Sequence, residues 1–70
     1  MEKEIKIYIN GKEKIITLNT NILELLKELN LQPDRVAVEI NKNVIPRQAF
    51  SNYILQAGDK VEVVRFVGGG

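Results

Sequence analysis

The residues that most clearly could take part in a reaction are the last three, Gly68, Gly69 and Gly70. They follow the mostly apolar run Val61–Val67. Glycine has no Cβ, so such an end is thin, flexible and gains nothing from packing. It suits threading through a narrow channel into the active site of another protein. The group it would present there is the α-carboxylate of Gly70, with an ordinary pKa of about 3.3–3.7, a poor electrophile until it is activated. The alternative at this point is a frayed terminus or a cloned linker.

Composition narrows what the chain can do by itself. It contains no cysteine and no histidine, which removes thiol chemistry, thiolate metal sites and the usual general base. No two carboxylates are placed for acid–base work. We therefore expect no catalytic residue, no metal site and no cofactor bound by the chain itself.

Size and charge predict a single globular domain. The chain has 70 residues, of which 44% are hydrophobic and 27% charged, as in ordinary globular proteins. The net charge is +1 with scattered basic residues, and no apolar run approaches the roughly 20 residues that cross a bilayer. We expect no nucleic-acid or membrane partner. The polar start Met1–Glu4 is unlike a signal peptide, so the expected location is the cytoplasm and the expected free state a monomer.

Two segments at the start of the chain predict a β-hairpin. Ile5–Ile9 alternates strictly between apolar and polar residues, which is typical of a half-buried strand. Asn10-Gly11 is the strongest two-residue hairpin signal. The second strand is expected over Lys12–Leu18, with Ile16 and Leu18 turned inward.

A short amphipathic helix of about ten residues should follow. Its apolar residues recur at helical spacing at Ile22, Leu25, Leu26 and Leu29. Thr20 or Asn21 can cap its start, and Asn21 with Glu24 could form a capping box. Asn30 is a plausible left-handed stop. A helix this short is marginal alone in water, so it must dock on the sheet.

The second half of the chain predicts two further strands and a fragment. Val36–Ile40 alternates, with Val36, Val38 and Ile40 expected to face the helix, and the last strand is expected over Val61–Val67. Val44-Ile45 would be a brief edge strand because Pro46 lacks a donor. Gln48–Leu55 is expected to form a helical turn and a loop that closes the core. Asp59 is expected to be a turn residue rather than a ligand.

These elements predict an α+β domain, with a mixed four- to five-stranded sheet packed on one helix. The first and last strands should occupy the centre of the sheet. Residues 1–67 would form the domain, and residues 68–70 a flexible tail that leaves a rigid element.

Alternation in the last strand predicts a docking surface. If Val61 and Val63 face the helix, Val64 and Phe66 face the other way, and we expect them beside Tyr8 and Ala37. Such an exposed apolar patch at the root of the tail often marks a partner surface. The alternative is that Phe66 folds over the sheet edge.

Val67 and Arg47 are two further candidates for contact with a partner. We include Val67, the last residue before the glycines, in this docking surface. Arg47 either contacts a partner or braces its own loop, and the sequence favours neither.

Several motifs together resemble the ThiS family of ubiquitin-like β-grasp sulfur carriers, over nearly the whole chain. They are Asn10-Gly11, Ala37–Asn41, Val44–Arg47, Leu55–Glu62 and the ending Phe66–Gly70. The minimal ending of this family is a Gly pair, so Gly68 would be a spacer before Gly69 and Gly70.

The resemblance implies a defined chemistry. An adenylating enzyme resembling the E1 enzyme of ubiquitin (ThiF-like), which uses ATP and Mg, would adenylate the Gly70 carboxylate. Sulfur from a cysteine desulfurase system would then replace AMP and leave a thiocarboxylate. Thiazole synthase (ThiG-like) would take that sulfur for thiazole formation in thiamine biosynthesis, and the carrier itself would not be an enzyme.

Three alternatives remain open at this stage. One is a carrier like the small subunit of molybdopterin synthase, which also ends in Gly-Gly but tends to be longer. Another is a ubiquitin-like protein modifier attached through Gly70. The third is an interaction module whose tail has no role.

Overall fold

The computed structural model describes residues 3–66. Val67 and the glycines Gly68–Gly70 lie outside these residues, so the predicted domain boundary and flexible tail stay predictions. In chain order the elements are β1 Glu4–Ile9, β2 Lys12–Thr17, α1 Ile22–Glu28, β3 Val36–Ile40, β4 Asn43–Ile45 and β5 Lys60–Arg65. Short 3-10 helices span Pro33–Arg35 and Arg47–Ala49. Within the described part, no helix has the length and apolarity needed to cross a membrane.

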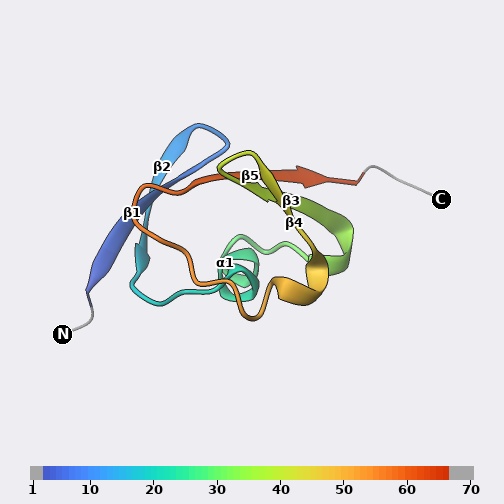
Figure 1. Ribbon diagram of the computed structural model, residues 1–70, viewed down its shortest axis with the longest axis horizontal. Helices are drawn as coiled ribbons and strands as arrows, with labels where there is room; N and C mark the ends of the chain where they lie inside the picture. The colour runs from blue at the N-terminus through green and yellow to red at the C-terminus, as the bar shows by residue number, and fades with distance from the viewer. Residues whose placement is uncertain (1–2, 67–70) are drawn as a thin grey trace.

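The strands form one mixed sheet with β5 at its centre. The order is β2-β1-β5-β3-β4, with β5 parallel to β1 and antiparallel to β3. Helix α1 lies against one face of the sheet (Figure 1). We call the opposite face the outer face. The predicted α+β architecture is confirmed, with the last strand at the centre of the sheet and the first strand directly beside it.

The first hairpin turns at Asn10-Gly11 as predicted. Asn10 has φ 49° and Gly11 has φ 85°, the positive values that a tight two-residue turn requires. The pairing continues from Ile9 opposite Lys12 to Glu4 opposite Thr17.

The inward prediction holds for Ile16, which is buried, but it is wrong for Leu18, which is 42% exposed. Strand β2 ends at Thr17 on the sheet edge, and the chain turns at once at Asn19, with φ 72°. Leu18 therefore lies beside the polar side of α1, where it lines a surface hollow with Glu24 and Lys27.

Local signals define both ends of α1. The Asn21 side chain accepts from the Glu24 N–H at 2.8 Å, and the Glu24 carboxylate accepts from the Asn21 N–H at 2.9 Å. This reciprocal pair is the predicted capping box. At the other end Asn30 has φ 61°, as predicted, and the Leu31 N–H donates to the Leu26 carbonyl at 2.9 Å. That bond satisfies a carbonyl that the helix end would otherwise leave unpaired.

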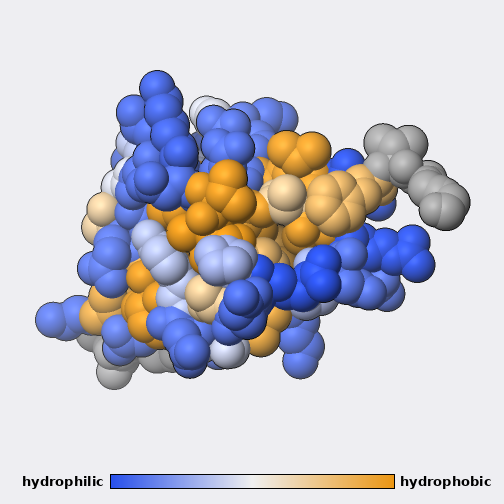
Figure 2. Space-filling model, turned by 45° about the vertical axis from the view of Figure 1, so that its right-hand side comes forward, coloured by the Kyte–Doolittle hydropathy of each residue, from blue (hydrophilic) through white to orange (hydrophobic). Residues whose placement is uncertain are grey.

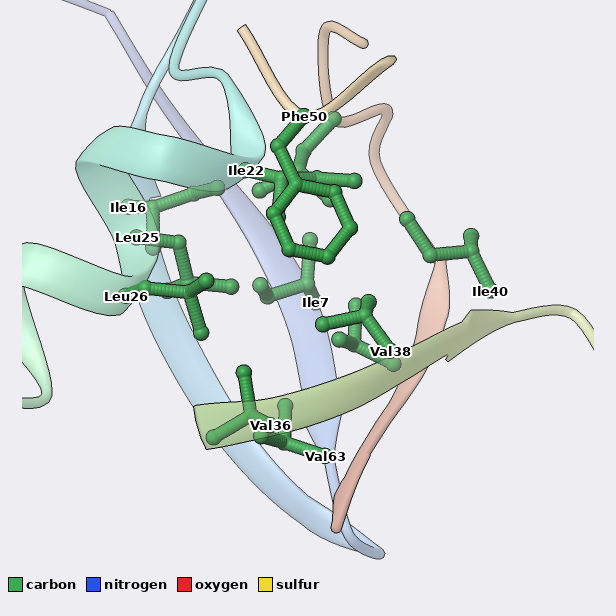
Figure 3. Close-up of a cluster of buried hydrophobic side chains, with 12 residues drawn as sticks. Ile7, Ile16, Ile22, Leu25, Leu26, Val36, Val38, Ile40, Phe50 and Val63 are labelled. Atoms are coloured by element: carbon green, nitrogen blue, oxygen red, sulfur yellow. The ribbon is translucent and has the colours of Figure 1, made fainter. Parts of the chain in front are cut away.

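The core lies between α1 and the inner face of the sheet. Figure 3 shows Leu25 and Leu26 of the helix directed toward Ile7 of β1, with Phe50 among them. The predicted inward residues of β3 are all buried: Val36, Val38 and Ile40. Phe50 and Leu55 reach this core from the predicted turn and loop, which close its end as expected.

Candidate functional site

The candidate site is the part of the outer face near the end of β5. We define the docking face as the exposed apolar residues Val44, Val64 and Phe66 together with the half-buried Ala37. Val64 and Phe66 are each 58% exposed and Val44 is 69% exposed. Ala37 lies opposite Val64 across β3 and β5. In the view of Figure 2, apolar side chains run across the middle of the surface toward the carboxyl-terminal side, bordered by hydrophilic ones.

The alternation of inward and outward side chains along β5 agrees with the sequence prediction. Val61 and Val63 are buried against the core, whereas Val64 is exposed. Because side chains alternate between faces along a strand, Val64 belongs to the outer face. Phe66, just beyond the strand, is also exposed rather than folded into the core.

Tyr8 does not lie beside Val64 and Phe66 as expected. It shares the outer face, but the parallel register places it opposite Lys60, at the start of β5. Phe66 is six residues further on, about 20 Å along an extended chain. Tyr8 instead lines a separate surface hollow with Gly11 and Lys60. A role of Tyr8 in docking stays a prediction, and Tyr8 lies outside the docking face.

Arg47 lies in the turn after Pro46 and is exposed. Its carbonyl accepts from the Phe50 N–H at 3.0 Å, which helps to hold the loop that carries Phe50 into the core. Within residues 3–66, no hydrogen bond or ion pair involves its guanidinium. The backbone of Arg47 therefore braces the loop, and a partner contact through its side chain stays a prediction.

Asn10 extends the contact between β1 and β5 beyond the end of β1. Its N–H donates to the Val61 carbonyl at 2.9 Å. Its side-chain amide donates to the Val63 carbonyl at 3.2 Å and accepts from the Val63 N–H at 2.9 Å. The side chain thus acts like one more peptide group of the strand.

The Phe66 N–H donates to the Arg35 carbonyl at 2.9 Å, so hydrogen bonds hold the chain up to Phe66. This residue is the root of the predicted tail. The hairpin role of Asn10 was predicted, but its bond to Val63 was not, because nothing near Asn10 in the sequence indicates a partner 53 residues away.

We expect Asn10→Gly to destabilise the domain by about 1–3 kcal/mol, because two hydrogen bonds to the Val63 peptide are lost while glycine still allows the turn. Urea unfolding measures the loss, and hydrogen exchange at the Val63 amide should become faster. Asn19→Gly is the matched control, since Asn19 also has a positive φ but makes no side-chain hydrogen bond within residues 3–66. Equal stability of the two variants would contradict this role.

Asp59 has the structural role predicted for it. Its carboxylate is buried and accepts from the Gln56 N–H at 2.9 Å and from the Asn41 side chain at 3.0 Å. The Asn41 side chain in turn accepts from the Lys60 N–H. Burial, and secondarily the charge of Asp59, raise the pKa of Tyr53 above its ordinary 10.0. The hydrogen bonds of Asp59 and Asn41 hold the start of β5 in place, as those of Asn10 hold its middle.

The strand order and the position of α1 against one face of the sheet define a ubiquitin-like β-grasp domain. The model of the ThiS family matches residues 3–70, and the chain belongs to this family. The crystal structure of the thiamine biosynthesis protein ThiS from Geobacter metallireducens is similar, with a TM-score of 0.81 and 36% identity, over 94% of this chain and 100% of that chain. A designed protein based on human erythrocytic ubiquitin shares the fold alone, with a TM-score of 0.58 and 19% identity, over 100% and 98% of the two chains.

Two curated relatives add detail. The chain is 41% identical over 66 residues to a thiazole synthase of Magnetococcus marinus, a match that covers 94% of this chain and 20% of the relative. The chain thus spans about a fifth of the length of that protein. It is 26% identical over 66 residues to the sulfur carrier protein ThiS of Escherichia coli, covering 94% of this chain and 100% of the relative.

Proposed function

We propose that this chain is a sulfur carrier of thiamine biosynthesis that carries sulfur as a thiocarboxylate on Gly70 and catalyses nothing itself. The observation that supports the proposal is the family match, which runs to residue 70 and so includes all three terminal glycines. Structural similarity to a thiamine biosynthesis protein, and a relative named a sulfur carrier that is matched over its full length, agree with it.

The proposed chemistry begins with the unreactive carboxylate. An oxygen of the Gly70 carboxylate attacks the α-phosphorus of ATP, and pyrophosphate leaves. The resulting acyl-adenylate has AMP as a good leaving group. The terminal sulfur of a persulfide, which the desulfurase forms from cysteine, attacks the carbonyl carbon and expels AMP. A thiol reductant then cleaves the S–S bond of the resulting acyl disulfide and leaves the thiocarboxylate. ATP and its Mg belong to the adenylating enzyme, and the carrier supplies only the acyl group.

The structure supports this role because the root of the predicted tail, Phe66, is anchored to the sheet by hydrogen bonds. Strand β5 is paired on both sides, and hydrogen bonds hold the chain up to Phe66. The four residues that follow can extend at most about 14 Å. An enzyme that reacts with Gly70 must therefore approach the docking face closely, so recognition of that face and delivery of the carboxylate would occur together.

Thiazole synthase is the proposed acceptor of the sulfur. A protein named thiazole synthase contains a segment similar to nearly all of this chain. A carrier domain within the same polypeptide as such an enzyme is consistent with a direct functional connection between the two. The ThiF-like adenylating enzyme and the desulfurase system are the further partners that the proposed chemistry requires.

Intact-mass measurement tests the function. The chain is incubated with ATP, Mg, the ThiF-like adenylating enzyme, a desulfurase, cysteine and a thiol reductant. We expect the small mass gain of one oxygen replaced by sulfur, located on Gly70 by fragmentation. A large covalent adduct would indicate a protein modifier, and no change would indicate an interaction module. Transfer of the sulfur to thiazole synthase, but not to molybdopterin synthase, then assigns the pathway.

We expect Phe66→Asp to weaken binding to the adenylating enzyme roughly 30-fold or more, because an exposed aromatic at the tail root is a favoured anchor of a docking surface. The fold should persist, since the Phe66 side chain is largely exposed. Calorimetric titration measures the affinity. Leu18→Asp is the control, since Leu18 is also an exposed hydrophobic residue but lies outside the docking face. Unchanged affinity of Phe66→Asp would remove this residue from the docking surface.

A further inference from the structure

Two glutamates lie directly opposite each other on the outer face. The antiparallel register of β3 and β5 pairs Glu39 with Glu62. Glu62 is exposed and Glu39 half-buried. Like charges directly opposite on neighbouring strands destabilise a sheet. A stable fold does not need this pair, so its presence calls for another reason.

Within residues 3–66, no ion pair compensates these carboxylates. The two ion pairs there join Lys6 to Glu13 and Lys14 to Glu28. Lys42 and Lys60 line a surface hollow together with Glu62, but neither forms an ion pair with it. That hollow lies toward the start of β5, away from Val64 and Phe66. The charge of the pair therefore remains available to a partner.

The pair directly adjoins the residues of the docking face. Glu39 is opposite Val44 on β4 and opposite Glu62 on β5, so these three form one row across the sheet. The next row toward the tail root is Ala37 and Val64. A protein surface that covers both Val44 and Val64 must cross β3 at Glu39 and meets Glu62 beside Val64 on β5.

Covering two unpaired carboxylates is costly unless the partner supplies a cation that hydrogen-bonds to them. Arginine suits this place better than lysine, because its planar guanidinium has several N–H donors and can bridge two neighbouring carboxylates. Apolar side chains beside that arginine would cover Val44, Val64 and Phe66. The outer face of the sheet thus favours a partner surface that is positively charged at one point and apolar around it.

We propose that the docking face with Glu39 and Glu62 binds a protein surface that presents an arginine among apolar side chains, with the guanidinium bridging the two carboxylates. The inference rests on the proposed function, since the partner tested is the adenylating enzyme that receives the tail. The glutamate pair thereby selects the partner, while Phe66 and Val64 contribute contact area.

The test uses the full-length double variant Glu39→Gln/Glu62→Gln, which keeps the shape and removes the charge. Its affinity for the adenylating enzyme, titrated without ATP, should fall at least roughly tenfold. Its free energy of unfolding should stay equal or rise, because the repulsion is gone. This opposite response of binding and stability separates docking from a merely structural role. Each single variant should lose nearly as much affinity as the double, since both carboxylates share one guanidinium.

Glu4→Gln/Glu13→Gln is the matched control. It removes the same charge from the same outer face, from strands β1 and β2 and away from Val44 and Val64. Its affinity should stay within about twofold of wild type, because exposed charges far from the contact are screened by salt. A loss equal to that of the Glu39/Glu62 variant would indicate general electrostatic steering and overturn the inference.

The two proposals fail in different ways. If the wild-type chain is charged with sulfur and the Glu39/Glu62 variant binds as tightly as wild type, the inference is wrong and the proposed function stands. If the wild-type chain neither binds the adenylating enzyme nor gains sulfur, the proposed function is wrong, and the inference falls with it.

Discussion

Replacing Gly70 by alanine is expected to reduce adenylation on the order of 100-fold, because a Cβ at the last residue displaces the carboxylate in a site that must close around it, and a misplacement of about 1 Å can have this effect. Deleting Gly70 should abolish productive sulfur transfer, since the new end is shorter by about 3.5 Å. The measurement is the rate of pyrophosphate release, followed by the intact mass of the product.

Gly68→Ala is the informative control for this prediction. It adds the same methyl group to the tail, but at the residue proposed to be a spacer before the Gly pair. We expect adenylation of this variant to remain within about tenfold of wild type, well short of the order of 100-fold expected at the reacting end. Normal thiocarboxylate formation by the chain without Gly70 would exclude that residue as the reacting end.

Phe50→Ala is expected to have the largest effect on stability, about 3–5 kcal/mol. Phe50 is 2% exposed and lies among side chains of the helix and the sheet, so its removal leaves a cavity as well as lost apolar burial. A domain of this size has a total stability of roughly 4–10 kcal/mol, so a large part of it would disappear. Urea unfolding followed by circular dichroism measures the change.

The chain contains its own control for this experiment. Phe66 is the same residue type but exposed, and Phe66→Ala should change the free energy of unfolding by less than about 0.5 kcal/mol. The two variants are also expected to separate stability from docking, since only the second should weaken partner binding while the domain remains folded. Similar destabilisation by both would contradict the assignment of Phe50 to the core and Phe66 to the surface.

The position of β5 connects these predictions. Its inner residues Val61 and Val63 complete the core, and its outer residues Glu62 and Val64 belong to the surface proposed to meet the partner. Phe50 is buried and has no part in the docking face, so a cavity left by its removal should act on docking only through the fraction of unfolded chain. Changes at Glu62 or Val64 should act on docking directly.

Local features could be read from the sequence because each depends on residues close together in the chain. The Asn10-Gly11 turn, the Asn21–Glu24 capping box and the stop at Asn30 involve contacts within a few residues. Alternation along β3 and β5 also depends only on the period of a strand, so the inward valines were predicted correctly. The family resemblance, including the terminal glycines, likewise required only the sequence.

The tertiary structure decided how distant segments are aligned. The parallel register of β1 and β5 places Tyr8 opposite Lys60 and far from Phe66, and it gives Asn10 its bonds to Val63. The register of β3 and β5 brings Glu39 opposite Glu62. No local pattern contains this information, because register depends on which set of inner side chains fills the core with α1 in place. The sequence alone therefore determined the elements, the faces within the strands and the family. The packing of the core determined the exposure of Leu18 beyond β2 and which outward residues became neighbours.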